Sequence, residues 1–145
     1  NQFNLTTKRY TYGEIESIVQ KGSSYITLYG KLVDRFGDNG LVAVCIGRVE
    51  EKRCHIELWL MSCRVLKRDM EYAMMDALVR KCQDNQINEI IGYYYPTTKN
   101  GMVKDFYSDM GFKLESNDCG NTVWSFFVTD NYIEKNIHIQ MEEAE

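Results

Sequence analysis

The stretch that decides the fold is Leu60–Leu78, which reads LMSCRVLKRDMEYAMMDAL. It begins as the end of an apolar strand and passes through a short basic turn. Near Asp69 it changes to apolar residues at three- and four-residue steps, the spacing of an amphipathic helix. A strand–turn–helix junction directs free backbone N–H groups and the positive end of the helix dipole to one point, which favours an anion. Arg64, Lys67 and Arg68 add positive charge there, although three ordinary surface charges on a solvated turn would give the same sequence.

Periodicity along the rest of the chain predicts further helices and strands. A first helix is expected after the capping box of Thr11 and Glu14, and a third over residues 103–110 with Gly111 as its C-cap. Apolar runs predict strands at residues 25–32 with Gly30 as a bulge, 41–46, 55–61, 88–95, 112–114 and 122–128. Residues 1–10 are interpreted as irregular, 34–40 as a turn, 48–53 as a hairpin tip, and the tail from Asn131 as either a last strand or a packed tail.

This order of elements predicts an α/β (α+β) fold, a mixed and mostly antiparallel sheet flanked by helices. The chain has 145 residues, 44% hydrophobic and 26% charged, which fits one domain over residues 1–145 and excludes disorder. No apolar run approaches about 18 residues, so no membrane span is expected. The net charge of -4 makes a general affinity for nucleic acid improbable.

Cysteine usage indicates reduced thiols in a cytoplasmic protein. The five cysteines include no pair with the two-residue gap of a zinc or redox motif, so no metal is expected. Cys63 precedes the basic turn and is a candidate nucleophile, but no histidine lies near it in sequence. The chain begins with Asn1 and not Met, and we expect it to be part of a longer protein.

A second informative block follows the strand that ends at Tyr95. It contains Asn100, Tyr107 and the pair Gly111-Phe112, and together with the order of elements it resembles the second half of a Gcn5-related N-acetyltransferase (GNAT) domain. In that family a loop with the pattern Arg/Gln-x-x-Gly-x-Gly/Ala binds pyrophosphate. Arg64-x-x-Lys67-x-Asp69 stands in its place here, without either glycine. Glycine is needed where backbone approaches a phosphate closely, so this departure weighs against coenzyme A binding.

Four runs narrow the resemblance to the C-terminal domain of FkbH-like proteins: residues 1–10, 34–40, 60–66 and 96–100. In that family the domain follows a haloacid-dehalogenase (HAD)-type phosphatase domain, which this sequence lacks. The resemblance implies a link to glyceryl transfer onto the phosphopantetheine thiol of an acyl carrier protein, in polyketide or secondary-metabolite biosynthesis. The catalytic Asp residues and the acyl-accepting Cys of that chemistry would lie in the missing part.

The GNAT resemblance also implies roles for particular residues. The arm of acetyl-CoA or of an acyl-phosphopantetheine would pair with the backbone at Leu60, Ser62 and Cys63. Its charged end would meet Arg64, Lys67, Arg68 and Asp69, and Asn100 would hold the arm or nearby backbone. Glu57 is the expected base and Tyr107 the expected acid. An exposed strand Glu, a packed Tyr and a helix-cap Asn remain equally simple interpretations.

Two functions are therefore compatible with the sequence. The first is an acyltransferase domain that acts on an acyl thioester of coenzyme A or of a carrier protein. The second is a non-catalytic module of the same fold, in which the basic turn recruits an acidic acyl carrier protein to the phosphatase-like domain.

Overall fold

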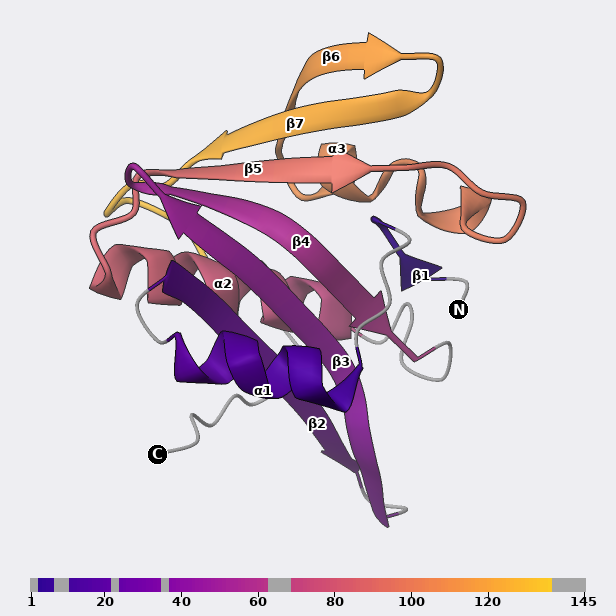
Figure 1. The fold of residues 1–145 in the computed structure, drawn as a ribbon, viewed down its shortest axis with the longest axis vertical. Helices are drawn as coiled ribbons and strands as arrows, with labels where there is room; N and C mark the ends of the chain where they lie inside the picture. Colours follow the sequence, from indigo (N-terminus) through magenta and orange to yellow (C-terminus); the bar gives the residue numbers. More distant parts are fainter. Residues whose placement is uncertain (1–2, 7–10, 22–23, 35–36, 63–68, 137–145) are drawn as a thin grey trace.

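The computed structural model describes residues 3–6, 11–21, 24–34, 37–62 and 69–136. The elements follow the predicted order, except that one strand is added at the N-terminus and that a 3₁₀ helix followed by a short α-helix replaces the single helix predicted over residues 103–110 (Figure 1). They are β1 Phe3–Asn4, α1 Tyr12–Gln20, β2 Tyr25–Asp34, β3 Gly37–Glu50, β4 Arg53–Met61, α2 Met70–Asp84, β5 Glu89–Tyr94, the 3₁₀ helix η3 Gly101–Val103, α3 Phe106–Asp109, β6 Lys113–Asp118 and β7 Asn121–Phe127.

All the strands belong to one sheet, in the order β2-β3-β4-β5-β7-β6, with β1 paired to β4. Every pairing is antiparallel except that of β4 with β5. Helices α1 and α2 lie on opposite faces of this sheet (Figure 1). The predicted fold class, a mixed and mostly antiparallel sheet flanked by helices, is confirmed.

Local sequence signals account for the helix boundaries. At the start of α1, the Glu14 N–H donates to Thr11 Oγ1 and the Thr11 N–H donates to Glu14 Oε1, both at 3.2 Å, which is the predicted capping box. Gly111 follows α3 with a φ of +92°, the left-handed conformation that glycine adopts without strain. The methionine stripe of α2 is core, since Met70, Met74 and Met75 are all buried.

The apolar residues form a large core on one face of the sheet and a smaller one on the other. The large core lies between the sheet and α2 and includes Trp59 and Leu78. The smaller cluster joins Ile18 of α1 to Ile46 and Leu58 of the sheet. No helix in the described part of the chain has both the length and the apolar character needed to cross a membrane.

Three segments for which the sequence predicted irregular structure or a turn contain strand residues. Phe3–Asn4 pairs with β4, β3 already begins at Gly37, and β3 and β4 continue to within two residues of each other around residues 51–52. Backbone groups pair whether or not side chains alternate, so these extensions left no periodic signal in the sequence. The register does shift between Gly30 and Lys31, but the predicted bulge at Gly30 is wrong in its strand: Gly30 faces Ala43 and Lys31 faces Leu41, so the extra residue is Val42 of β3.

Gly92 in β5 permits a close approach of the Tyr107 side chain to the sheet. A Cβ atom built on Gly92 would lie 2.4 Å from the Tyr107 ring, nearer than carbon atoms pack. The Tyr107 ring therefore occupies the space that any other residue at position 92 would need.

We predict that Gly92→Ala lowers the free energy of unfolding by about 1–3 kcal/mol, because the added methyl group forces the Tyr107 ring out of place. Gly101→Ala is the matched control, since a Cβ there meets nothing within 4 Å. Chemical denaturation of both variants measures the difference. Equal stability of the two variants would show that the core absorbs the methyl group.

Candidate functional site

The two parallel strands at the centre of the sheet pair over only three residues. Arg53, Cys54 and His55 of β4 face residues 89–91 of β5, and beyond His55 the two strands no longer pair. β5 nevertheless continues against β7 as far as Tyr94. An opening in the backbone ladder therefore begins beside His55 and widens towards the end of β4 (Figure 1).

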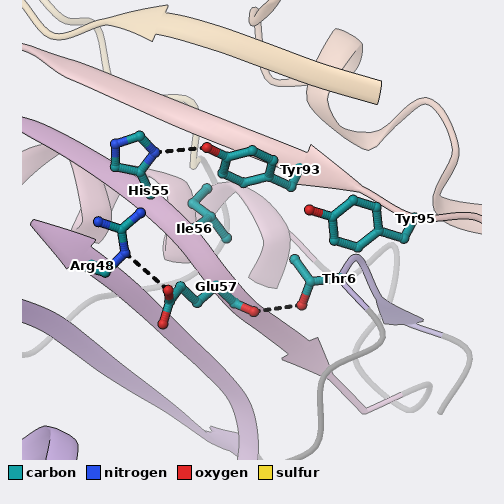
Figure 2. Close-up of a pocket in the computed structure, with 7 residues that line it drawn as sticks. All are labelled: Thr6, Arg48, His55, Ile56, Glu57, Tyr93 and Tyr95. Atoms are coloured by element: carbon teal, nitrogen blue, oxygen red, sulfur yellow. Dashed lines mark hydrogen bonds and ion pairs between the residues drawn. The ribbon is translucent and has the colours of Figure 1, made fainter. Parts of the chain in front are cut away.

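A β-bulge in β4 lies at the start of this opening. Opposite β3 the register jumps, because Gly47 faces Ile56 whereas Ile46 faces Leu58. Glu57 is the extra residue, and a bulge of this kind bends the strand and redirects side chains. The Glu57 side chain lies on the face of the sheet that carries α1, where its carboxylate pairs with Arg48 (Figure 2).

The opening holds residues 3–6 of the chain itself. Phe3 and Asn4 pair antiparallel with Met61 and Leu60, on the side of β4 that β5 has left. The Tyr95 N–H donates to the Leu5 carbonyl at 2.8 Å. Residues 3–6 thus bridge the two strands, and Leu5 is fully buried as part of the large core.

Asn100 fixes this arrangement from the other side. Its Nδ2 donates to the carbonyls of Asn4 and Tyr95, both at 2.9 Å. Its Oδ1 accepts from the Thr97 N–H at 2.7 Å. Asn100 is 1% exposed, and its amide bonds to two segments, the N-terminal residues and the loop that follows β5.

A pocket of about 250 Å³ adjoins the opening on the α1 face of the sheet. Figure 2 shows the side chains of β3, β4 and β5 converging on it together with one from the N-terminal segment. The lining is mostly polar and consists of Thr6, Arg48, His55, Ile56, Glu57, Tyr93 and Tyr95.

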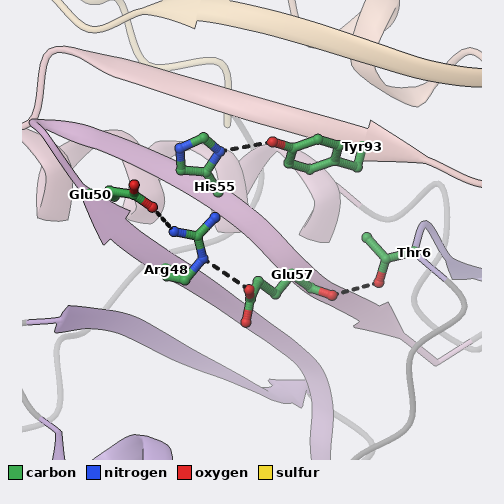
Figure 3. Close-up of polar contacts among 6 residues, drawn as sticks. All are labelled: Thr6, Arg48, Glu50, His55, Glu57 and Tyr93. Carbon is green, nitrogen blue, oxygen red and sulfur yellow. Dashed lines mark hydrogen bonds and ion pairs between the residues drawn. The ribbon is translucent and has the colours of Figure 1, made fainter.

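An ion pair between a residue of β3 and a residue of β4 lines the pocket. Arg48 Nε lies 3.2 Å from Glu57 Oε2, and the same guanidinium also contacts Glu50 (Figure 3). The carboxylates raise the pKa of Arg48. On the other side, Thr6 Oγ1 donates to the Glu57 carbonyl at 2.6 Å. Glu57 is therefore held by both its carboxylate and its backbone.

His55 and Tyr93 form a second polar pair across β4 and β5. His55 Nδ1 lies 2.8 Å from the Tyr93 hydroxyl. Burial lowers the pKa of His55 below its ordinary value of 6.5, and the Arg48 guanidinium lowers it further. Burial raises the pKa of Tyr93. At neutral pH the imidazole is therefore uncharged and able to accept a proton.

Tyr107 of α3 reaches the opening from the opposite face. Its hydroxyl donates to the Tyr93 carbonyl at 3.0 Å and accepts the Tyr93 N–H at 3.1 Å. The N–H and carbonyl groups of alternate residues along a strand point to the same edge of that strand. The N–H and carbonyl of Tyr93 therefore point to the same edge as those of Ile91 and Tyr95, which is the edge that faces β4. Burial raises the pKa of Tyr107 well above its ordinary value, which keeps the phenol protonated.

The other predicted site residues are placed as follows. Leu60 is half-buried and pairs with both Asn4 and Val44, and the Ser62 N–H donates to the Val42 carbonyl at 2.8 Å. Asp69 precedes α2 with a φ of +70°. The remaining four, Cys63, Arg64, Lys67 and Arg68, lie outside the described residues.

The backbone at Asp69 has the left-handed conformation that glycine favours. The resemblance to the GNAT loop places a glycine or alanine at this position. Aspartate is one of the few other residues that adopt such a φ. The conformation is thus compatible with a glycine at this position, although the side chain here is aspartate.

Sequence reasoning missed His55, Tyr93 and Arg48 as members of the site. His55 and Glu57 stand two residues apart on a predicted strand, and that spacing alone could have placed both at one face. Arg48 was assigned to the hairpin tip, whereas β3 extends to Glu50 and carries Arg48 into the sheet.

Comparison with known proteins identifies the fold. No family model and no curated protein matches the chain. Among solved structures, Ard1 from Thermoplasma volcanium is 18% identical with a TM-score of 0.64, over 86% of this chain and 84% of that one. The paia N-acetyltransferase from Thermoplasma acidophilum, in complex with coenzyme A, is 15% identical with a TM-score of 0.57, over 80% and 79%.

A third similar structure is the ribosomal-protein-S18-alanine N-acetyltransferase from Escherichia coli. It is 10% identical with a TM-score of 0.61 and covers 93% of this chain and 86% of its own. Acetyltransferases of the GNAT family from other bacteria match similarly. The chain therefore has the fold of the GNAT acetyltransferases.

We predict that His55 makes stability depend on pH. Its pKa is lower in the folded chain than in the unfolded chain, so the unfolded state binds more protons below about pH 6.5. The free energy of unfolding should therefore rise with pH up to about 6.5 and lose this contribution as the pH falls. His55→Asn should remove that part of the slope in denaturant titrations between about pH 5 and 7.5. Identical slopes for both proteins would contradict this prediction.

We predict that two substitutions at Asp69 differ in stability. Asp69→Gly should be the more stable of the two variants, because glycine adopts a positive φ without strain. Asp69→Val should lower the free energy of unfolding by about 1–2 kcal/mol, because a β-branched side chain clashes in that conformation. Urea denaturation of the two variants tests this, and a valine variant as stable as the glycine variant would refute it.

Proposed function

We propose that this chain is an acyltransferase-type domain that binds an acyl thioester carried by coenzyme A or by the phosphopantetheine of a carrier protein. The observation that carries the proposal is the opening between β4 and β5, which begins beside a polar pocket containing His55 and Glu57. An extended arm with amide groups suits a strand edge, and an acceptor suits the adjoining pocket.

The residues around the opening fit such an arm. The carbonyl of Glu57, the N–H of Tyr95 and the amide of Asn100 all form hydrogen bonds to residues 3–6. A pantetheine arm also contains amide groups, and these would form hydrogen bonds with the same three groups once residues 3–6 have moved. When bound, the thioester supplies the acyl group for transfer.

Three side chains near the opening are the candidates for the acid and the base of acyl transfer. Tyr107 stays protonated and is the candidate acid for a departing thiolate. Glu57 was the base expected from the sequence, and its carboxylate is paired with Arg48. His55 is uncharged at neutral pH, and its Nε2 has no bonding partner within the described part of the chain, so it is a second candidate for accepting the proton of an amine.

The finer proposal is that the chain is the C-terminal domain of an FkbH-like protein and that its thioester is borne by an acyl carrier protein. Three of the four sequence runs behind that resemblance meet in the opening, since Asn4 pairs with Leu60 and accepts a hydrogen bond from Asn100. A HAD-type phosphatase domain would precede it in the whole protein. The pathway would be glyceryl transfer in secondary metabolism.

A second candidate function is a non-catalytic module that docks a carrier protein. One observation favours it: residues 3–6 lie where the arm would pair with β4. In that case the basic side chains Arg64, Lys67 and Arg68 would attract the acidic carrier surface, and the opening would have a purely structural role.

We predict that the chain binds acetyl-CoA with a measurable heat in isothermal titration calorimetry. We also predict that it binds an acyl carrier protein more tightly in the phosphopantetheine-loaded form than in the unloaded form, because only the loaded form has an arm for the opening.

The docking function gives a different result in the same titrations. Loaded and unloaded carrier protein would bind equally, the affinity would fall steeply with salt, and acetyl-CoA would give no heat at millimolar concentration. That combination would overturn the acyltransferase proposal and retain only the common fold.

A further inference from the structure

We propose that residues 3–6 and the thioester arm compete for one site, so that the chain carries its own exchangeable occupant of the β4–β5 opening. This inference rests on the proposed function, because it names what regulates access to the same site. Binding of the arm then requires residues 3–6 to leave the opening.

The competition follows from the backbone groups that residues 3–6 occupy. Asn4 pairs with Leu60 on the edge of β4, and Leu5 accepts the Tyr95 N–H from β5 at 2.8 Å. An extended chain that adds to the edge of a strand forms hydrogen bonds with the free N–H and carbonyl groups along that edge. A second extended chain cannot pair with the same residues of β4 at the same time.

The side chains of the segment occupy the start of the opening as well. Thr6 Oγ1 donates to the carbonyl of Glu57, the bulge residue, at 2.6 Å. Leu5 is fully buried and belongs to the large core. The segment therefore occupies both the edge where an arm would pair and the position next to the acidic and basic side chains.

The segment is short enough to be exchangeable. Its ladder to β4 covers only two residue pairs, whereas β3 pairs with β4 over eight. A binding site that is open only part of the time lowers the apparent affinity in proportion to the open fraction. Weakening the segment should therefore tighten ligand binding, and fixing it should abolish binding.

A disulfide lock tests the second expectation. Asn4 and Leu60 face each other, and the Asn4 carbonyl is turned towards Asn100 and away from β4. They therefore form the narrow, non-hydrogen-bonded kind of pair, whose Cα separation of about 4.5 Å suits a disulfide. The double variant Asn4→Cys/Leu60→Cys should bind acetyl-CoA at least 20-fold more weakly when oxidised.

Reduction of the same protein with a phosphine should raise its affinity for acetyl-CoA at least 20-fold over that of its own oxidised form. Acetyl-CoA is the probe because it has no free thiol to attack the disulfide. Each single cysteine variant is the control for pairing with native thiols, and thermal unfolding of the oxidised and reduced forms shows that both are folded.

Thr6→Val tests the first expectation. It removes the hydroxyl that donates to Glu57 and keeps the shape of the side chain. Loss of one hydrogen bond should raise the open fraction and tighten acetyl-CoA binding about fivefold. Thr129→Val is the matched control, because Thr129 is exposed and contacts Gln83 only through its carbonyl, and it should leave the affinity unchanged.

The outcomes separate this inference from the proposed function. If the unmodified chain binds acetyl-CoA and the oxidised double variant binds it equally well, competition is wrong and the proposed function stands. If the unmodified chain, Thr6→Val and the reduced lock all fail to bind acetyl-CoA at millimolar concentration, and loaded and unloaded carrier protein bind equally, the proposed function is wrong and the competition fails with it. Binding by Thr6→Val that exceeds that of the unmodified chain supports both.

Discussion

The parting of β4 from β5 is the constraint on which the rest of the site depends. Two central strands that pair over only three residues leave a row of backbone N–H and carbonyl groups on both inner edges. Such groups cannot remain buried without partners, so something must satisfy them. In this chain the partners are residues 3–6, the Asn100 amide and the Tyr107 hydroxyl. Each of them brings a hydrogen-bonding group to the opening, and together they make the opening polar.

The parting also explains why both faces of the sheet contribute to one site. From one face Tyr107 reaches the peptide of Tyr93, and the absence of a side chain at Gly92 lets its ring lie against β5. From the other face the bulge at Glu57 adds a carboxylate beside the pocket. In a fully paired ladder the Tyr93 groups that Tyr107 contacts would bond to β4 instead.

The sequence predicted those parts of the fold whose signals are local. The capping box at Thr11 and the stripe of α2 depend on residues three or four apart, and both were correct. The strand at Phe3–Asn4 was missed because it is held by backbone pairing with residues nearly sixty positions away. The pairing of His55 with Tyr93 joins two strands 38 residues apart, and no periodicity reports such a contact. The roles of Glu57, Tyr107 and Asn100 came from resemblance, and they remain proposals.

The position of Thr6 couples the two halves of the site. Its hydroxyl bonds to the bulge, and its side chain also lines the pocket beside Glu57 and Tyr95. A ligand that displaced residues 3–6 from β4 would therefore remove one wall of the pocket at the same moment. The pocket would widen whenever residues 3–6 left the opening, and a bound arm would keep it wide, so an acceptor would meet its full binding surface mainly after the thioester had bound. The order of binding would then follow from the side chain of Thr6, which the N-terminal segment contributes to both the opening and the pocket.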